Sequence, residues 1–173
     1  AGIGWIGKHT NLITRDYGSW IFLGELLLDA ELDYDEPFND DLCGSCTACL
    51  DACPTNAFPE PYVLDSNKCI SYLTIEHRGD LPTELENKLS GWIYGCDICQ
   101  EVCPWNITFS QLSTENSFQP RENLQERPIP QWKKLTEEDF RILFKKSAVK
   151  RTKYIGLKRN ISVIEKNNTN NLN

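Results

Sequence analysis

Apolar positions at the start of the chain predict short extended segments separated by glycine turns. They gather in residues 3–6 and again at residues 12–13. An aromatic and aliphatic run over residues 19–28 favours a longer strand. Residues 29–41 are acidic and typical of a loop.

The middle of the chain predicts short elements only. Residues 48–52 and 97–102 fit short helices, and residues 62–64 fit a strand. We expect another helix over residues 82–89, because Pro82 suits a first helical turn and acidic residues follow it.

The last third of the chain predicts an irregular stretch followed by two helices. Residues 111–135 are polar and contain three prolines, which favours a tether. Thr136 can cap the next helix, with the acid Asp139 three residues later as in a capping box. A second helix is expected over about residues 148–164, and the polar tail 167–173 is expected to be disordered.

Eight cysteines fall into two runs and one isolated residue. The first run has the spacing C-x2-C-x2-C-x3-C-P and ends at Pro54. The second has the spacing C-x2-C-x3-C-P and ends at Pro104, with Ile93 at the position of the missing first cysteine. The spacing of the first run is typical of bacterial ferredoxins, in which the fourth cysteine of such a run ligates the other cluster. Cys69, between the two runs, can supply the missing ligand.

The spacing therefore predicts two [4Fe–4S] clusters with crossed ligation, and adjacent clusters imply electron transfer. Three cysteines, each separated from the next by two residues, wrap around one cubane. The x3 spacing then places the sulfur of the fourth cysteine at the neighbouring cluster. The first ligand set is Cys43, Cys46, Cys49 and Cys103. The second ligand set is Cys53, Cys69, Cys96 and Cys99.

Other uses of eight cysteines remain to be weighed. Two zinc sites with four cysteines each would also use them all. Zinc knuckles need neither a third cysteine nor the x3-Cys-Pro ending, so iron–sulfur is favoured and zinc is the alternative. Disulfides suit secreted chains, but no secretory signal opens this sequence. Buried structural thiols would not explain the regular spacing.

A glycine pattern near the start imitates nucleotide-binding motifs. Gly2, Gly4 and Gly7 match G-x-G-x-x-G, and Lys8 nearly completes a P-loop. The P-loop requires Ser or Thr next, whereas this chain has His9. We favour a glycine-rich turn that enters a strand.

Charge is distributed unevenly along the chain, whose net charge is −7. Residues 1–65 contain two basic and twelve acidic residues, whereas residues 141–164 contain eight basic and no acidic ones. Such a basic stretch can bind a polyanion locally.

The most apolar run, residues 20–28, is nine residues long. A membrane span needs about 20, so no membrane association is expected. Because methionine is absent throughout, we expect the chain to start inside a longer protein.

The residues that flank the cysteines resemble the epoxyqueuosine reductase family. Among them, Ser-Tyr-Leu-Thr-Ile-Glu after Cys69 is especially specific. The similarity reaches from residue 1 to about residue 164. The similar segments are residues 4–8, 18–25, 43–55, 69–76, 95–106 and 150–160.

This resemblance implies a cobalamin-dependent enzyme with two clusters that reduces epoxyqueuosine to queuosine at the wobble position of tRNA. It implies an α+β fold in which a bacterial-ferredoxin-like dicluster domain lies between part of a cobalamin-binding α/β domain and a helical, HEAT-like repeat. The family's catalytic acid would precede Ala1, so this chain alone is expected to be inactive. The implied divisions are 1–41 (cobalamin domain), 42–110 (clusters), 111–135 (tether), 136–166 (repeat) and 167–173 (tail).

The resemblance also implies binding residues. The cobalamin candidates are Lys8, Ser19, Ser71 and Asp97, although each could be an ordinary surface, turn or capping residue. The tRNA candidates are Lys145, Lys146, Lys150, Arg151, Lys153, Lys158 and Arg159, although a solvated helix face would look similar. We expect a cytoplasmic monomer that takes electrons from an unidentified donor.

Three other functions fit parts of the pattern. A related reductive dehalogenase would share the cobalamin and cluster chemistry. A dicluster ferredoxin, which carries electrons only, would need neither residues 1–41 nor the helical pair. A zinc-stabilised RNA-binding module would use the same thiols.

Overall fold

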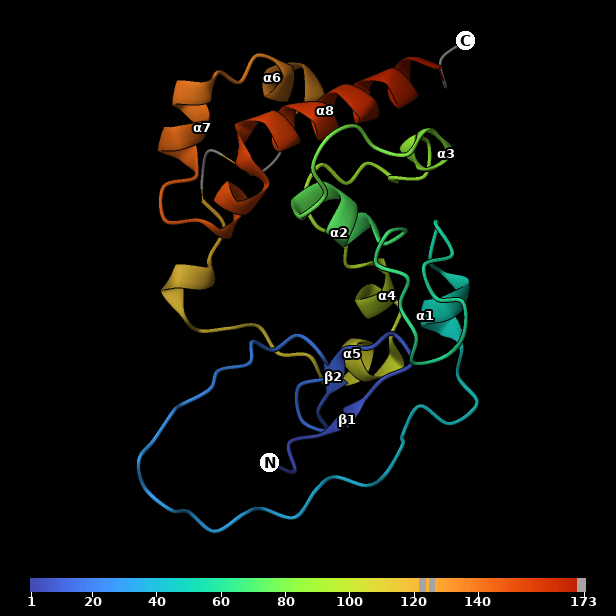
Figure 1. Ribbon diagram of the computed structural model, residues 1–173, viewed down its shortest axis with the longest axis vertical. Helices are drawn as coiled ribbons and strands as arrows, with labels where there is room; N and C mark the ends of the chain where they lie inside the picture. The colour runs from blue at the N-terminus through green and yellow to red at the C-terminus, as the bar shows by residue number, and fades with distance from the viewer. Residues whose placement is uncertain (122–123, 125–126, 171–173) are drawn as a thin grey trace. The chain divides into compact units, whose positions relative to one another are not determined.

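The computed structural model describes residues 1–121, 124 and 127–170 (Figure 1). The chain forms two compact units. Unit 1 consists of Ala1–Leu64 and Asp97–Leu112, and unit 2 consists of Asp65–Cys96 and the residues from Ser113 on. No helix in the described part of the chain is long and apolar enough to cross a membrane.

Unit 1 combines a two-stranded antiparallel sheet with short helices. In the sheet, Trp5 lies opposite Ile13, and helix α1 contacts helix α4. The elements are β1 (Trp5–Ile6), β2 (Leu12–Ile13), α1 (Ala48–Asp51), α4 (Ile98–Glu101) and α5 (Pro104–Phe109).

The glycines that imitate a nucleotide motif are required by the packing of this sheet. A Cβ atom on Gly4 would lie 1.9 Å from the carbonyl oxygen of Ile13. One on Gly7 would lie 2.5 Å from Cδ1 of the same isoleucine. Side chains at these positions would force β1 and β2 apart. The glycine pattern is therefore explained without a bound phosphate.

The core of unit 1 joins the sheet to the second cysteine run. Trp5, Ile13 and Cys103 are buried together. Trp105 packs edge-on against Trp5 with ring centroids 4.8 Å apart, and its Nε1 donates a hydrogen bond to the carbonyl of Leu42. Aromatic packing therefore holds the cysteine-bearing segments against β1.

Two predicted strands in unit 1 are wrong. Residues 19–28 form no strand, and Leu26 and Leu27 are 88% and 96% exposed. In the described part of the chain no strand pairs with them, so apolar composition alone does not make a strand there. Residues 62–64 form only the isolated bridge between Glu60 and Val63, because Tyr62 has a φ of +67°.

Unit 2 is built around a long C-terminal helix, α8, shown in red in Figure 1. This helix contacts α2, α3, α6 and η2. The elements are α2 (Ile70–Ile75), α3 (Thr83–Glu86), η1 (Asn116–Phe118), α6 (Ile129–Lys133), α7 (Glu137–Leu143), η2 (Ala148–Thr152) and α8 (Lys153–Asn170).

The buried face of α8 contributes to two apolar clusters. Leu157 and Ile161 pack with residues of α6 and α7, including Phe144 just after α7. Val163 and Ile164 pack against α2 and the leucines around α3. Helix α8 thus connects the elements of unit 2 through apolar burial.

Several predicted helices are confirmed, with changed bounds. The short helices around 48–52 and 97–102 are α1 and α4. Both end before the proline, and Pro104 then opens α5, which the sequence analysis did not predict. The expected helix over 82–89 is limited to α3.

The predicted capping box of α7 is confirmed. The Thr136 hydroxyl accepts a hydrogen bond from the Asp139 amide at 3.1 Å, and the Asp139 carboxylate accepts one from the Thr136 amide at 3.0 Å. The next helix is longer than expected, so disorder is wrong for residues 167–170, which lie in α8. Residues 171–173 lie outside the described residues, as do 122–123 and 125–126 of the predicted tether. Within that tether, α6 gives residues 129–133 helical structure.

Candidate metal centre

The four cysteines of the first ligand set line one cavity in unit 1. Its volume is about 140 Å³. The cavity is comparable to one of ~150 Å³ that holds a benzene molecule, so it has room for a compact polyatomic group. The other residues that line it are Lys8, His9, Ile13, Leu42, Pro104 and Trp105.

Local structure explains how distant cysteines meet at this cavity. Cys43 and Cys46 lie on the loop before α1, and Cys49 lies within α1. Cys103 caps the start of α5, where Pro104 takes the first helical position. Because α4, just before Cys103, contacts α1, the fourth thiol meets the first three.

The chemistry of these four thiols suits an iron–sulfur cluster. None of the four forms a disulfide. Burial raises the pKa of the Cys49 thiol, and the nearby Cys103 and Cys43 thiols raise it further. Bound iron would reverse this effect, because thiolates would be its ligands. Among the described residues, no three His, Cys, Asp or Glu side chains are placed to hold a single metal ion.

Lys8 fixes the first cysteine loop to the sheet. Its side chain is 9% exposed, and its Nζ donates hydrogen bonds to the carbonyls of Gly44 at 2.6 Å and Cys46 at 2.9 Å. The ammonium group therefore lies beside the cavity that the thiols line. A fixed positive charge there favours anionic ligands.

His9 is the second polar residue at this cavity, and the sequence analysis did not assign it a role. Its side chain is 2% exposed, and burial lowers its pKa. Its Nδ1 accepts a hydrogen bond from the Asn11 amide at 3.2 Å. Its Nε2 is buried and has no hydrogen-bond partner among the described residues.

Ser19 belongs to a buried hydrogen-bond network in unit 1. Its amide donates to Oδ1 of Asn106 at 2.6 Å, and Nδ2 of Asn106 donates to its hydroxyl at 2.9 Å. Nε2 of Gln100 donates to the same hydroxyl at 3.0 Å. The hydroxyl of Ser19 thus positions α4 and α5, the helices on either side of Cys103.

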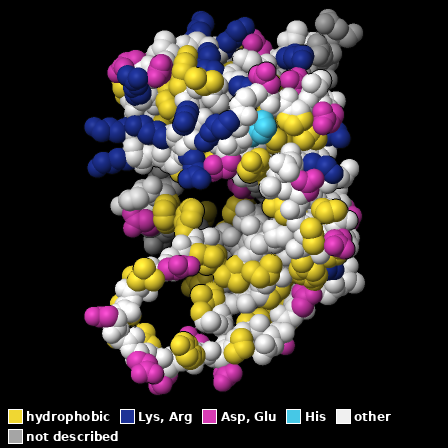
Figure 2. Space-filling model, viewed as in Figure 1, with side chains coloured by type: hydrophobic (Ala, Val, Ile, Leu, Met, Phe, Trp, Pro, Cys, Tyr) yellow, Lys and Arg dark blue, Asp and Glu magenta, His cyan; other side chains and the backbone are white. Residues whose placement is uncertain are grey.

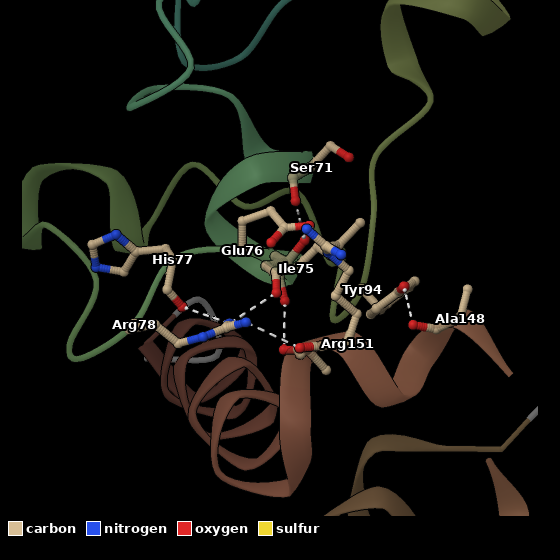
Figure 3. Close-up of polar contacts among 10 residues, drawn as sticks. Ser71, Ile75, Glu76, His77, Arg78, Tyr94, Ala148 and Arg151 are labelled. Carbon is tan, nitrogen blue, oxygen red and sulfur yellow. Dashed lines mark hydrogen bonds and ion pairs between the residues drawn. The ribbon is translucent and has the colours of Figure 1, made fainter. Parts of the chain in front are cut away.

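The other two cobalamin candidates have fewer partners. The hydroxyl of Ser71, on α2, points away from Glu76 and Arg151 in Figure 3 and forms no hydrogen bond among the described contacts. Asp97 precedes α4 without capping it through its side chain. Burial raises the pKa of its carboxyl group, and the charge of Glu101 adds to that effect.

The second ligand set is divided between the two units. Cys53 and Cys99 belong to unit 1, whereas Cys69 and Cys96 belong to unit 2. Within unit 1, the Sγ of Cys53 accepts a hydrogen bond from the Ala57 amide at 3.3 Å. The joint ligation by these four residues stays a prediction from the spacing.

Comparison with known proteins narrows the function. A family model described as "4Fe-4S double cluster binding domain" matches residues 42–106. The epoxyqueuosine reductase of Cellulophaga algicola is 51% identical to this chain over 95% of its length, and that of Escherichia coli is 46% identical over 94%. Over nearly its whole length the chain is similar to epoxyqueuosine reductases. It spans about half the length of the curated relatives it matches, 53% of the Cellulophaga protein.

Solved epoxyqueuosine reductases share the fold. One crystal structure matches 96% of this chain with a TM-score of 0.89 and 32% identity, and the match covers 44% of that protein. Another, with an epoxyqueuosine-modified tRNA-Tyr stem loop, matches with a TM-score of 0.83 and 31% identity over the same shares. These matches confirm the predicted dicluster module within a mainly helical fold with a small sheet.

The predicted tRNA-contacting residues separate into two groups. Figure 2 shows Lys and Arg side chains gathered over α7, η2 and the start of α8. The exposed members are Lys145, Lys146, Lys150, Arg151 and Lys153. Among these exposed residues, Arg151 pairs with Glu76, as Figure 3 shows.

Arg159 and Lys158 have structural partners within unit 2. Nη2 of Arg159 donates to the carbonyl of Leu73 at 2.7 Å, and its Nη1 donates to that of Gly79 at 2.7 Å. Nζ of Lys158 donates to the carbonyl of Lys133 at 2.5 Å. Arg159 therefore binds the end of α2 and is poorly placed to contact a phosphate as well.

Proposed function

We propose that this chain provides the cluster-binding part of an enzyme that reduces epoxyqueuosine to queuosine at the wobble position of tRNA. The arrangement of Cys43, Cys46, Cys49 and Cys103 around one cavity carries this proposal, because it is the site that crossed ligation requires. The name and the roughly 50% identity of the relatives support the reaction.

The reaction removes the epoxide oxygen as water and leaves a carbon–carbon double bond. It consumes two electrons and two protons. When bound, two [4Fe–4S] clusters would supply the electrons singly, and cobalamin would supply the reduced metal that reacts with the epoxide. The polypeptide contributes binding, orientation and electrostatic tuning.

The cysteines and Lys8 then have different roles at the site. The first ligand set holds cluster 1, and the second set, with Cys53, Cys69, Cys96 and Cys99, holds cluster 2. Lys8 keeps the first cysteine loop in place through two carbonyls.

Cobalamin binding rests on the family resemblance. Of the four candidates, Lys8 and Ser19 already use their polar side-chain atoms within unit 1, so we propose that they shape the loops at the cofactor. Ser71 and Asp97 keep polar atoms for direct contacts. Residues 1–41 would then be part of the cobalamin-binding domain, and residues 136–166 the start of a HEAT-like repeat.

The exposed lysines around η2 are proposed to bind the tRNA backbone. Lys145, Lys146, Lys150 and Lys153 are exposed. Lysines with free ammonium groups can replace the counterions of phosphates, which makes binding salt-dependent. The printed description of the structure with a tRNA stem loop supports RNA as the partner.

Replacing Lys145, Lys146 and Lys150 together by alanine is expected to weaken tRNA binding and to flatten its salt dependence. Each lost phosphate contact should reduce the slope of log K against log salt concentration by about 0.7–0.9. Fluorescence anisotropy with a labelled anticodon stem loop at several salt concentrations measures both effects. The control is Lys88→Ala, an exposed lysine near α3. An unchanged slope in the triple variant would show that this surface does not bind the RNA.

The function itself is tested with the holoprotein expressed from its complete gene. The protein is incubated anaerobically with cobalamin, a chemical reductant and tRNA that contains epoxyqueuosine. Nucleoside mass spectrometry should show conversion to queuosine. If the clusters accept and donate electrons but no queuosine forms, the chain belongs to a simple electron carrier instead.

A further inference from the structure

The Nε2 atom of His9 is buried and has no hydrogen-bond partner among the described residues. Three buried side-chain atoms lack a hydrogen-bond partner among the described residues: Trp5 Nε1, His9 Nε2 and Arg127 Nη1. Of these three residues, only His9 lines the cavity of the first ligand set. A buried donor without an acceptor is costly, so an acceptor is expected in that cavity.

The hydrogen bond at the other ring nitrogen identifies which atom of His9 carries the proton. Nδ1 lies 3.2 Å from the amide nitrogen of Asn11, whose N–H can only donate. Nδ1 is therefore the acceptor and carries no proton. In the neutral ring the proton then lies on Nε2, which makes Nε2 a hydrogen-bond donor.

The packing around the ring keeps it beside the cavity. A Cβ atom on Gly7 would lie only 3.1 Å from Cε1 of His9, so the ring lies close to the backbone between β1 and β2. His9 is 2% exposed, so bulk solvent does not reach the ring. The remaining acceptors are those that a group bound in the cavity would bring.

We propose that Nε2 of His9 donates a hydrogen bond to a sulfur atom of the cluster held by Cys43, Cys46, Cys49 and Cys103, and thereby raises the reduction potential of that cluster. Reduction adds negative charge to the sulfurs, and a donor stabilises the more negative state more strongly. His9 is thus a positioning and tuning residue and not a cluster ligand. The inference rests on the proposed function, because cluster 1 must be bound.

Two substitutions at His9 separate hydrogen bonding from packing. His9→Phe fills the space without a donor, whereas His9→Gln keeps an N–H at a similar position. We expect His9→Phe to disfavour one-electron reduction of cluster 1 about tenfold, a downward shift of about 59 mV in its midpoint potential. His9→Gln should restore most of that shift. The midpoint of the other cluster should not move in either variant.

Pulsed EPR on the unchanged holoprotein provides a test that needs no substitution at His9. Within residues 1–173 the histidines are His9 and His77, so labelling with ¹⁵N-histidine places one of these two labels at the cavity of the first ligand set. The reduced cluster should show a weak histidine ¹⁵N coupling. It should persist in the matched control His77→Phe, because His77 Nε2 lies 2.8 Å from the Asp80 carbonyl in unit 2.

The outcomes distinguish failure of this inference from failure of the proposed function. Full iron content without any histidine coupling, or an unchanged cluster 1 midpoint in an iron-loaded His9→Phe protein, would overturn the assignment of His9 alone. Absence of iron from the unchanged protein would overturn the proposed function. If His9→Phe cannot retain iron, the labelled unchanged protein decides.

Discussion

Replacing Cys103 by alanine is expected to remove about half of the iron and to abolish reduction of epoxyqueuosine. Cys103 is 6% exposed and lines the cavity with Cys43, Cys46 and Cys49, which are more than fifty residues earlier in the chain. Three thiolates do not complete the ligation of a [4Fe–4S] cluster, so the cluster should be lost or degraded. Iron analysis, EPR of the reduced protein and the queuosine assay measure the effect.

The crossed arrangement makes this prediction specific. Cys103→Ala and Cys46→Ala should remove the same EPR signal, although Cys103 belongs to the second run. Ser45→Ala is the control, because Ser45 is an exposed neighbour of Cys46. If Cys103→Ala instead removed the signal that Cys96→Ala removes, each run would ligate its own cluster and crossed ligation would be wrong.

Replacing Asn160 by leucine is expected to lower the free energy of unfolding of the protein by about 1–3 kcal/mol, the cost of a buried polar group left without its hydrogen bond. Asn160 is fully buried on α8. Its Nδ2 donates to the carbonyls of Thr74 at 2.8 Å and Ile93 at 2.9 Å. Its Oδ1 accepts from Arg159 at 2.9 Å. With leucine the Ile93 carbonyl loses this hydrogen bond, whereas the Thr74 carbonyl keeps that of the Thr152 hydroxyl and Arg159 keeps that to Leu73.

Urea denaturation followed by circular dichroism measures this loss as a lower midpoint at unchanged slope. Ser162→Ala on the same helix is the control. Ser162 is exposed and, among the described residues, its hydroxyl donates a hydrogen bond to the Lys158 carbonyl alone, so its effect should stay within about 0.5 kcal/mol. Equal midpoints for Asn160→Leu and Ser162→Ala would show that Asn160 does not connect α8 to α2.

The convergence of the four cysteines of the first ligand set on one cavity could be predicted from the sequence, because ligand spacing depends on covalent geometry. Loops of two and three residues can place sulfurs around a cubane in few ways, so the spacing predicted that Cys103 lies near Cys43. The capping box at Thr136 was also predictable, because it depends only on residues three apart.

Features that depend on tertiary contacts could not be predicted in this way. The run over residues 19–28 fitted the pattern of a strand, but a strand also needs a neighbour for its backbone groups. The network of Ser19, Gln100 and Asn106 joins residues more than eighty positions apart, and no local sequence pattern predicts it. In the sequence His9 only departs from the P-loop pattern, and its place beside the four cysteines of the first ligand set is seen only in the structure.

The most direct test of the account is the metal content and iron spectrum of the holoprotein purified without oxygen. Two clusters of four irons each predict eight irons and eight sulfides per chain. Mössbauer spectra should then show only [4Fe–4S] centres, with no zinc in the protein. Two zinc ions per chain with no inorganic sulfide would contradict the account.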